Sequence, residues 1–254
     1  MELLDIYLQS LTHKIVSQDI KSNMLNHCYM INTKDEYYLD TLAHFMAKEI
    51  FCLSDHAPCD QCVSCDKVSH SNMVDLLIYP KGDKSLMVED INEIVSDCYI
   101  RPMDSKYKVY ILKNFDLCTT QAQNKILKTL EEPPMNVVFI LTCTNSSGVL
   151  PTIASRSKKI NETELSQEII QKYLIDLNIK NASLIASMSD GSLAIANTLS
   201  HNPASVDIVD IVFDVLQNLK SSTDILRFSS KIAGKAVTYK LPFPYKISPF
   251  GNVY

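Results

Sequence analysis

Four of the eight cysteines in this chain lie within one short window, at Cys52, Cys59, Cys62 and Cys65. An even spread over 254 residues would place fewer than one cysteine there, so chance is a poor explanation. Four thiolates at such short spacings are a ligand set that tetrahedral zinc takes readily. We therefore expect a structural zinc site. The alternatives are reduced thiols without a metal, or a redox-active pair.

Two histidines flank this window. His56 lies inside the cysteine segment and His70 follows it closely. Either imidazole could replace one cysteine as a ligand, although a flanking histidine is more often a polar surface residue. The four-cysteine set remains the prediction.

Arg156 is a second candidate functional site, separate from the cysteines. It lies in the run Ser155-Arg156-Ser157, shortly after a predicted strand. A guanidinium in such a loop can reach a phosphate that a neighbouring molecule binds. The alternative is a surface salt bridge with no catalytic role.

The chain shows no phosphate-binding loop of its own. No glycine precedes Gly82, and the segment after the first predicted strand reads Asn32-Thr33-Lys34-Asp35-Glu36. Without glycine the loop cannot readily turn its amides onto a pyrophosphate, and the two carboxylates would repel one. A chain with an exposed arginine and no phosphate loop is expected to assist nucleotide hydrolysis in another subunit.

Composition limits the class of protein. The chain has 254 residues, 46% of them hydrophobic, and a net charge of −5. It can bury a sizeable core, but it lacks the basic excess of a stand-alone nucleic-acid binder. Glu2 and Asp5 do not suit a signal peptide and no apolar run is long enough to span a membrane, so we expect a cytoplasmic protein.

Strands alternate with helices through the first part of the chain. The β-branched and apolar runs that predict strands cover residues 28–31, 74–79, 107–112 and 136–142. Apolar residues at helical spacing lie between them. Thr120 to Gln123 fits a helix capping box, and Pro133-Pro134 ends that helix. This order predicts an α/β fold with a parallel sheet flanked by helices.

We expect three parts in the chain. Residues 1–161 form the α/β core with the cysteine module at 52–65, and residues 162–200 form a small helical domain. Residues 201–254 form a short helical C-terminal segment. Its tail, rich in proline and aromatic residues, either docks a partner or packs on the chain's own surface.

The run from Lys125 to Pro134, KILKTLEEPP, together with the cysteine module and Ser155-Arg156-Ser157, resembles bacterial clamp-loader subunits of the AAA+ family. The similarity covers roughly residues 10 to 200. Within this family the chain most resembles subunits of the delta-prime type, which belong to DNA polymerase III. It implies an AAA+ core and a small helical lid domain. It also implies that the four cysteines are zinc ligands and that Arg156 is an arginine finger acting in trans.

Three departures from the ATPase members indicate a non-hydrolysing subunit. The phosphate-loop position has no glycine, the Walker B position reads Lys113-Asn114 without a carboxylate, and Ala194 replaces the sensor-two arginine. Ser157 stands where the finger motif usually has cysteine, which the arginine's role tolerates. The resemblance therefore implies no bound ATP and no catalytic activity of the chain alone.

The partners that the resemblance implies are tau/gamma-type ATPase subunits, the delta subunit, the sliding clamp and, through the complex, primer-template DNA. Two other functions stay open at this point. One is an active AAA+ ATPase with an unorthodox loop, and the other is a zinc-dependent scaffolding protein unrelated to replication.

Overall fold

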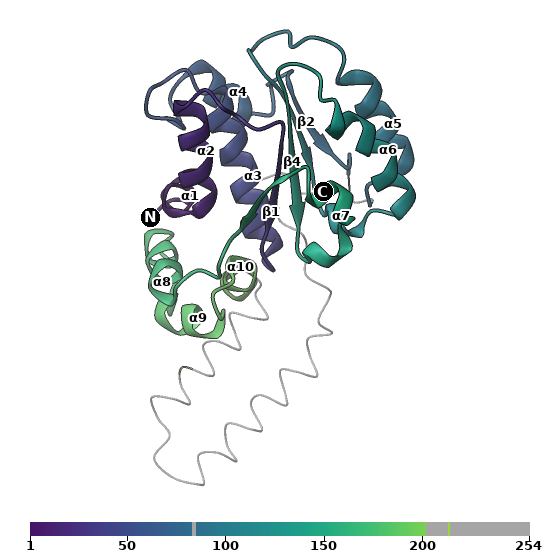
Figure 1. Cartoon of the computed structure of the whole chain (residues 1–254). Coiled ribbons are helices and arrows are strands. Elements are labelled where there is room, and N and C mark those ends of the chain that lie inside the picture. Colours follow the sequence, from purple (N-terminus) through teal and green to yellow (C-terminus); the bar gives the residue numbers. More distant parts are fainter. Residues whose placement is uncertain (83–84, 202–212, 214–254) are drawn as a thin grey trace. The chain divides into compact units, whose positions relative to one another are not determined.

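The computed structural model describes residues 1–82, 85–201 and 213 (Figure 1). Within them the chain divides into two compact units, Leu3–Thr163 and a smaller unit that begins at Glu164 and includes Met1–Glu2. The predicted C-terminal segment at 201–254, with its proline-rich tail, lies outside the described residues apart from residues 201 and 213. No helix of the described part is long and apolar enough to cross a membrane.

The larger unit is built on a five-stranded sheet in the order β2-β3-β4-β1-β5. All neighbouring strands are parallel, with Met30 opposite Leu141 and Tyr110 opposite Phe139. The predicted parallel α/β core is confirmed. The strands are β1 Cys28–Asn32, β2 Leu76–Tyr79, β3 Lys108–Leu112, β4 Val137–Cys143 and β5 Lys158–Asn161.

Helices cover both faces of this sheet, with α3 on one face and α5 and α6 on the other (Figure 1). Short 3-10 turns follow β3 and β4 at Phe115–Leu117 and Ser146–Gly148. The helices of this unit are α1 Leu3–Gln9, α2 Leu11–Lys21, α3 Glu36–Phe51, α4 Val63–Ser69, α5 Val88–Asp97, α6 Thr120–Glu131 and α7 Pro151–Ala154.

The near-continuous apolar runs of the strands follow from burial on both faces. Tyr110 and Phe139 stack with their ring centroids 5.3 Å apart, and both are fully buried in the core beneath α5 and α6. Alternate residues such as Ile111 and Ile140 are buried as well, although they lie outside that core cluster. Because strand side chains alternate between faces, these residues belong to the opposite face of the sheet.

Several features of the first unit were not predicted. The helices α1 and α2 precede β1, and they attach through polar contacts: Thr12 Oγ1 donates to Glu162 Oε1 at 2.6 Å, and the Tyr7 hydroxyl donates to the buried Glu49. Burial raises the pKa of Glu49 to about 8. The fifth strand was missed too, because only Ile160 of its four residues is buried and the pattern is too polar to indicate a strand.

The helix predicted to start with a capping box begins differently. Thr119, not Thr120, is the N-cap, and its hydroxyl accepts from the amide of Ala122 at 3.2 Å. Gln123 does not accept from the N-cap amide as a capping box requires; its Nε2 donates instead to the carbonyl of Cys118 at 3.2 Å. The Gln123 side chain is 2% exposed, and its amide also donates to the backbone of the loop that follows β4. Tertiary contacts therefore override the local motif.

The smaller unit contains α8 Gln167–Asp176, α9 Ala182–Met188 and α10 Leu193–His201 in its described part. Gly191 joins two segments of this unit, since the Gly191 carbonyl accepts a hydrogen bond from the amide of Leu165 at 3.1 Å. Its φ is +80°, and a Cβ there would lie 2.9 Å from the carbonyl oxygen of Leu165. Only glycine fits this turn without strain.

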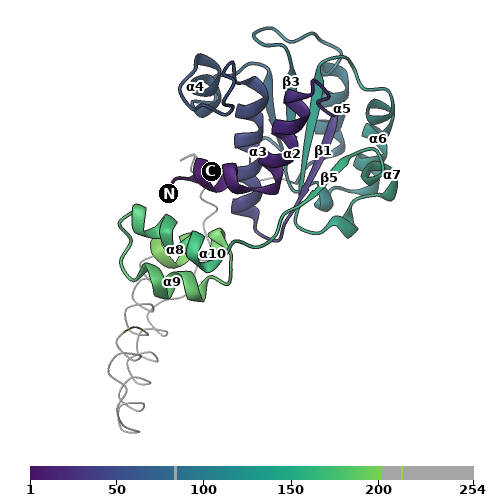
Figure 2. The same ribbon diagram turned by 60° about the vertical axis from the view of Figure 1, so that its left-hand side comes forward.

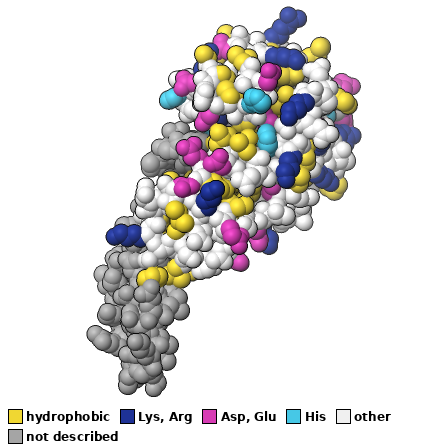
Figure 3. All heavy atoms as spheres, turned by 90° about the vertical axis from the view of Figure 1, so that its left-hand side faces the viewer, with side chains coloured by type: hydrophobic (Ala, Val, Ile, Leu, Met, Phe, Trp, Pro, Cys, Tyr) yellow, Lys and Arg dark blue, Asp and Glu magenta, His cyan; other side chains and the backbone are white. Residues whose placement is uncertain are grey.

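Basic and acidic side chains are both spread over the face drawn in Figure 3. On that face, Lys and Arg do not gather into one continuous basic surface. This distribution agrees with the net charge of −5 and gives no sign there of a stand-alone site for a nucleic-acid backbone.

Candidate functional site

The four predicted cysteines lie together at the end of α3. Cys52 follows the last residue of α3, Cys62 is the N-cap of α4, and Cys65 lies in the first turn of α4. Their sulfur atoms, with that of Cys59, all lie within 4.8 Å of one another. The Sγ atoms of Cys52 and Cys62 are 3.9 Å apart, close to the roughly 3.8 Å that a tetrahedron with Zn–S bonds of about 2.3 Å requires.

Backbone amides already point at these sulfurs. Amide N–H groups of Cys59, Cys62 and Cys65 donate to the sulfurs of Cys52, Cys59 and Cys62 at 3.4 to 3.5 Å. Such bonds stabilise the thiolate form. All eight cysteines are free thiols, so no disulfide competes for the set.

The pKa values within the cluster diverge. Burial acts to raise the pKa of Cys62, but hydrogen bonds from the backbone of Leu53 and Cys65 and from neighbouring thiols outweigh it and lower the value to about 6. Burial raises the pKa of Cys65. A divalent cation at the centre would favour the thiolate form of all four, so the donor set fits a zinc ion.

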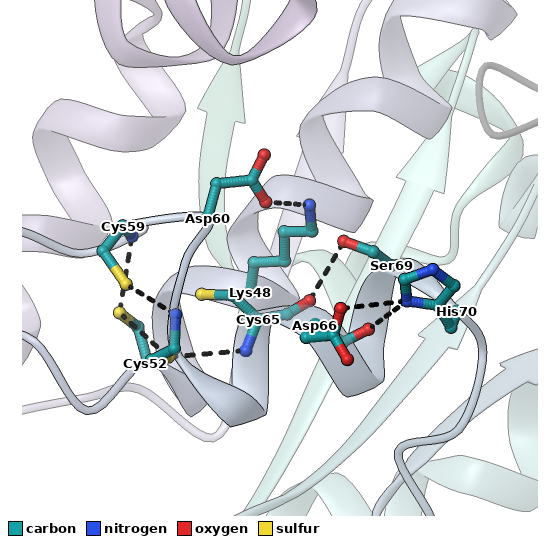
Figure 4. A network of polar contacts seen from close by, with 9 residues as sticks. Lys48, Cys52, Cys59, Asp60, Cys65, Asp66, Ser69 and His70 are labelled. Carbon is teal, nitrogen blue, oxygen red and sulfur yellow. Dashed lines mark hydrogen bonds and ion pairs between the residues drawn. The ribbon is translucent and has the colours of Figure 1, made fainter.

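A buried lysine fixes the loop between the cysteines. The Lys48 ammonium on α3 pairs with Asp60, which lies between Cys59 and Cys62 (Figure 4). The same Nζ lies 5.0 Å from the centroid of the Phe45 ring. The Lys48 side chain is only 4% exposed, so Asp60 supplies the counter-charge that its burial requires. Sequence reasoning missed this pair, although a lysine directly after the apolar residues Met46 and Ala47 was a usable signal.

Neither flanking histidine joins the cluster among the described residues. The ring of His70 bonds Asp66, with Nδ1 3.2 Å from Oδ1, and in Figure 4 it lies beyond Ser69 and away from the sulfurs. His56 is exposed, and its backbone amide donates to the Ser54 hydroxyl at 3.2 Å. The four-cysteine set is the one that the structure brings together.

The position of a phosphate loop is occupied by an acidic helix cap. Asp35 is the N-cap of α3, and its carboxylate accepts from the amide of Tyr38 at 3.0 Å. Free amides at a helix N-terminus are what binds phosphate in a phosphate loop. Here one of them is taken by a carboxylate that is 8% exposed, and the residue carries the charge that repels phosphate.

The Walker B position carries an internal ion pair. Lys113 directly follows β3, and its Nζ lies 2.9 Å from Oδ2 of Asp40 on α3. Asn114 has a left-handed backbone and starts the 3-10 turn. In the smaller unit, Ala194 lies in the first turn of α10. None of these three residues offers the carboxylate or the guanidinium that an ATPase site needs.

Arg156 lies in the short connection between α7 and β5, two residues before the strand begins. Its Nη1 donates to the carbonyl of Thr152 at 2.8 Å, and its Nη2 lies 2.8 Å from Oε1 of Glu131. The side chain is 36% exposed. It borders an open groove of about 630 Å³ between the C-terminal end of α2 and residues 155–158. The arginine is thus accessible, and it also makes the surface salt bridge that was the alternative to a finger.

Gln123 anchors the backbone just before α7, the short helix that leads to this arginine. Its Nε2 donates to the carbonyl of Gly148 at 2.8 Å, and its Oε1 accepts from the amide of Leu150 at 2.8 Å. Ser157 is held as well, since its hydroxyl donates to Ile153 O at 2.9 Å and lies 3.1 Å from the Cys28 sulfur. A buried glutamine in a predicted amphipathic helix was the available signal for this anchor.

The cysteine cluster and the arginine loop are separate sites. Figures 1 and 2 both place α4 on the opposite side of the sheet from α7. A metal ion in the cluster would therefore not meet the groups that Arg156 reaches.

Comparisons with known proteins give a consistent picture. The family described as "DNA polymerase III, delta subunit" matches residues 8–166. The DNA polymerase III subunit gamma of Buchnera aphidicola (subsp. Baizongia pistaciae) is 32% identical over 65% of this chain and 47% of its own length. The DNA polymerase III subunit delta' of Bacillus subtilis is 30% identical over 77% of this chain and 60% of its own length. The chain thus spans about half the length of these relatives.

Solved structures with the same fold include two proteins of Thermotoga maritima. A DNA polymerase III gamma subunit-related protein matches with a TM-score of 0.53 and 20% identity, over 82% of this chain and 66% of its own. The RuvB Holliday junction branch migration motor matches with a TM-score of 0.53 and 13% identity, over 95% and 70%. These similarities establish an AAA+ fold.

We expect the substitution Lys48→Met to loosen the cysteine segment. The variant keeps the stem of the side chain against Phe45 but removes the charged partner of Asp60, a hydrogen bond worth about 1.5–3 kcal/mol. Urea unfolding should show a loss of that size, and hydrogen exchange should quicken across residues 52–65.

The matched control is Lys67→Met, which removes an exposed pair with Asp104 on the other side of the same module. That pair is worth under about 1 kcal/mol. Equal and small effects of the two substitutions would contradict the structural role of Lys48.

Proposed function

Because the chain belongs to the family described as DNA polymerase III, delta subunit, we propose that it is a non-hydrolysing AAA+ subunit of a bacterial clamp loader, of the delta-prime type. In this role it acts in a ring beside tau/gamma-type ATPase subunits and the delta subunit, and helps to load a sliding clamp onto primer-template DNA in the cytoplasm.

The nucleotide position carries the proposal. Asp35 caps the helix that would hold a phosphate, and Lys113 pairs with Asp40 where an ATPase carries acidic residues for magnesium. Both features place the wrong charge for binding Mg-ATP. They favour the delta-prime type over the gamma and tau types that also occur among the relatives.

Arg156 is the residue that would act on the neighbouring ATPase. A guanidinium stays charged at any working pH and offers five donors in a planar fork. An accessible arginine bordering a groove can neutralise charge that builds on a γ-phosphate in a facing subunit. The chain would thus contribute to hydrolysis in trans, with no catalytic activity of its own.

The four cysteines are proposed to hold one structural zinc ion. The ion would join the end of α3 to α4 and fix a segment that has little regular structure. In such modules metal binding supplies much of the local folding energy.

For the isolated chain we expect no ATP binding in the micromolar range and no hydrolysis, because acidic side chains and an internal ion pair occupy the site. Titration calorimetry with Mg-ATP should give only dilution heat, with a tau/gamma-type ATPase as the positive control. Stoichiometric heat with low-micromolar affinity would instead favour the active ATPase.

The purified chain should contain one zinc ion, and Cys62→Ser should lose it. Structural zinc sites contribute on the order of 10 kcal/mol to local folding, so residues 52–70 should loosen while the sheet stays intact. Metal analysis by mass spectrometry and hydrogen exchange test both points. The control Cys98→Ser removes another buried thiol and should keep the metal. Wild-type protein free of zinc under reducing conditions would refute the site.

In the assembled complex we expect Arg156→Ala to lower the ATPase stimulated by clamp and DNA, while folding and assembly stay near normal. An arginine finger acting in trans is worth about 10³ to 10⁵ at its own site, but the other sites keep theirs, so total turnover falls partly and clamp loading falls more. Arg156→Lys should restore little because lysine lacks the planar fork.

Arg101→Ala is the control for this experiment, since Arg101 is also exposed and lies outside the groove. Clamp loading at the wild-type level by an assembled Arg156→Ala complex would exclude the finger role.

A further inference from the structure

The Arg156 side chain is already oriented in the single chain. Two of its five N–H donors are engaged, one with the Thr152 carbonyl and one with the Glu131 carboxylate, each at 2.8 Å. Among the described residues, no further hydrogen bond of the guanidinium is present. Three donors therefore remain for a ligand, while two contacts limit the rotation of the side chain.

The position of Glu131 is unfavourable for its own helix. It is the last residue of α6, where a carboxylate opposes the macrodipole, and the C-cap residue Glu132 carries a second one. Only one of the two is compensated: Glu131 pairs with Arg156, whereas the side chain of Glu132 makes no hydrogen bond or ion pair with another described residue. Of the two carboxylates at this helix end, the one of Glu131 is therefore the one that binds the arginine.

The loop and the helix that carry this pair are firmly joined. Gln123 on α6 bonds the backbone on both sides of Val149, just before α7. The amide of Arg156 donates to the carbonyl of Ile153 at 3.0 Å. Glu131 consequently acts from a fixed position relative to the backbone of Arg156.

We propose that Glu131 is a positioning residue for Arg156: its carboxylate and the Thr152 carbonyl hold two edges of the guanidinium so that the others face the phosphate of a neighbouring nucleotide. This inference rests on the proposed function of Arg156. Glu131 is not a catalytic residue, because it touches only the arginine.

The opposite role, a latch that competes with the phosphate, fits the geometry less well. Glu131 is not among the residues that line the groove beside Arg156, so it does not occupy the space that a ligand would enter. A half-exposed pair of this kind is also weak. Such a contact cannot withhold an arginine from a desolvated phosphate, but it can reduce the rotamer freedom that the arginine loses on binding.

The test uses the full chain in a complex in which only the ATPase site facing Arg156 is active, the other ATPase subunits having lost the phosphate-loop lysine. Glu131→Ala should lower kcat at that site about two- to five-fold with little change in KM. Glu131→Gln, which keeps the hydrogen bond, should recover at least half of the loss. In an Arg156→Ala background, Glu131→Ala should have no further effect.

Glu132→Ala is the matched control, because it removes the neighbouring carboxylate and should keep wild-type kcat. A thermal unfolding midpoint within about 3 °C of wild type for Glu131→Ala separates positioning from a general loss of stability. The inference is overturned if Glu131→Ala matches Glu132→Ala, raises kcat, or lowers activity further when Arg156 is absent. If Arg156→Ala is itself silent, the proposed function fails and the positioning role fails with it.

Discussion

The burial of α3 on almost every side is the constraint on which the rest of the larger unit depends. A helix in that position cannot leave polar side chains without partners, because unpaired buried charges are costly. Three charged residues of α3 therefore each hold another segment. Lys48 holds Asp60 of the cysteine loop, Glu49 holds Tyr7 of α1, and Asp40 holds Lys113 after β3.

These contacts also fill, within this AAA+ core, the positions that face a nucleotide in an ATPase. In an ATPase the start of this helix and the end of the neighbouring strand face phosphate and magnesium. Here Asp35 and the Lys113–Asp40 pair satisfy the same positions from within the chain. The charges at these positions are balanced within the chain, and in the proposed function a different element meets the neighbouring subunit.

That element is the segment from α6 to β5. Gln123 sets the backbone of the loop, and Glu131 and Thr152 set the side chain of Arg156. The cysteine cluster takes no part, since it lies across the sheet from α7. The chain thus combines a stabilised module at one side with an oriented arginine at the other, and the two can be altered independently.

The sequence by itself determined the parallel α/β core, the clustering of four cysteines and the absence of a glycine-rich loop. These features depend on local patterns: apolar runs of strand length, short cysteine spacing and residue type. It also placed the end of α6 before Pro133, because proline inside a helix removes a hydrogen bond and clashes with the preceding turn.

Only the tertiary structure decided the partners of the polar residues. Lys48 pairs with Asp60, Gln123 bonds the loop before α7, and Glu131 reaches Arg156 twenty-five positions along the chain. The tertiary structure also revealed β5, which the sequence did not indicate because two of its residues are lysines and one residue is buried. Such pairings follow from which elements the sheet order brings together, and no local propensity encodes that order.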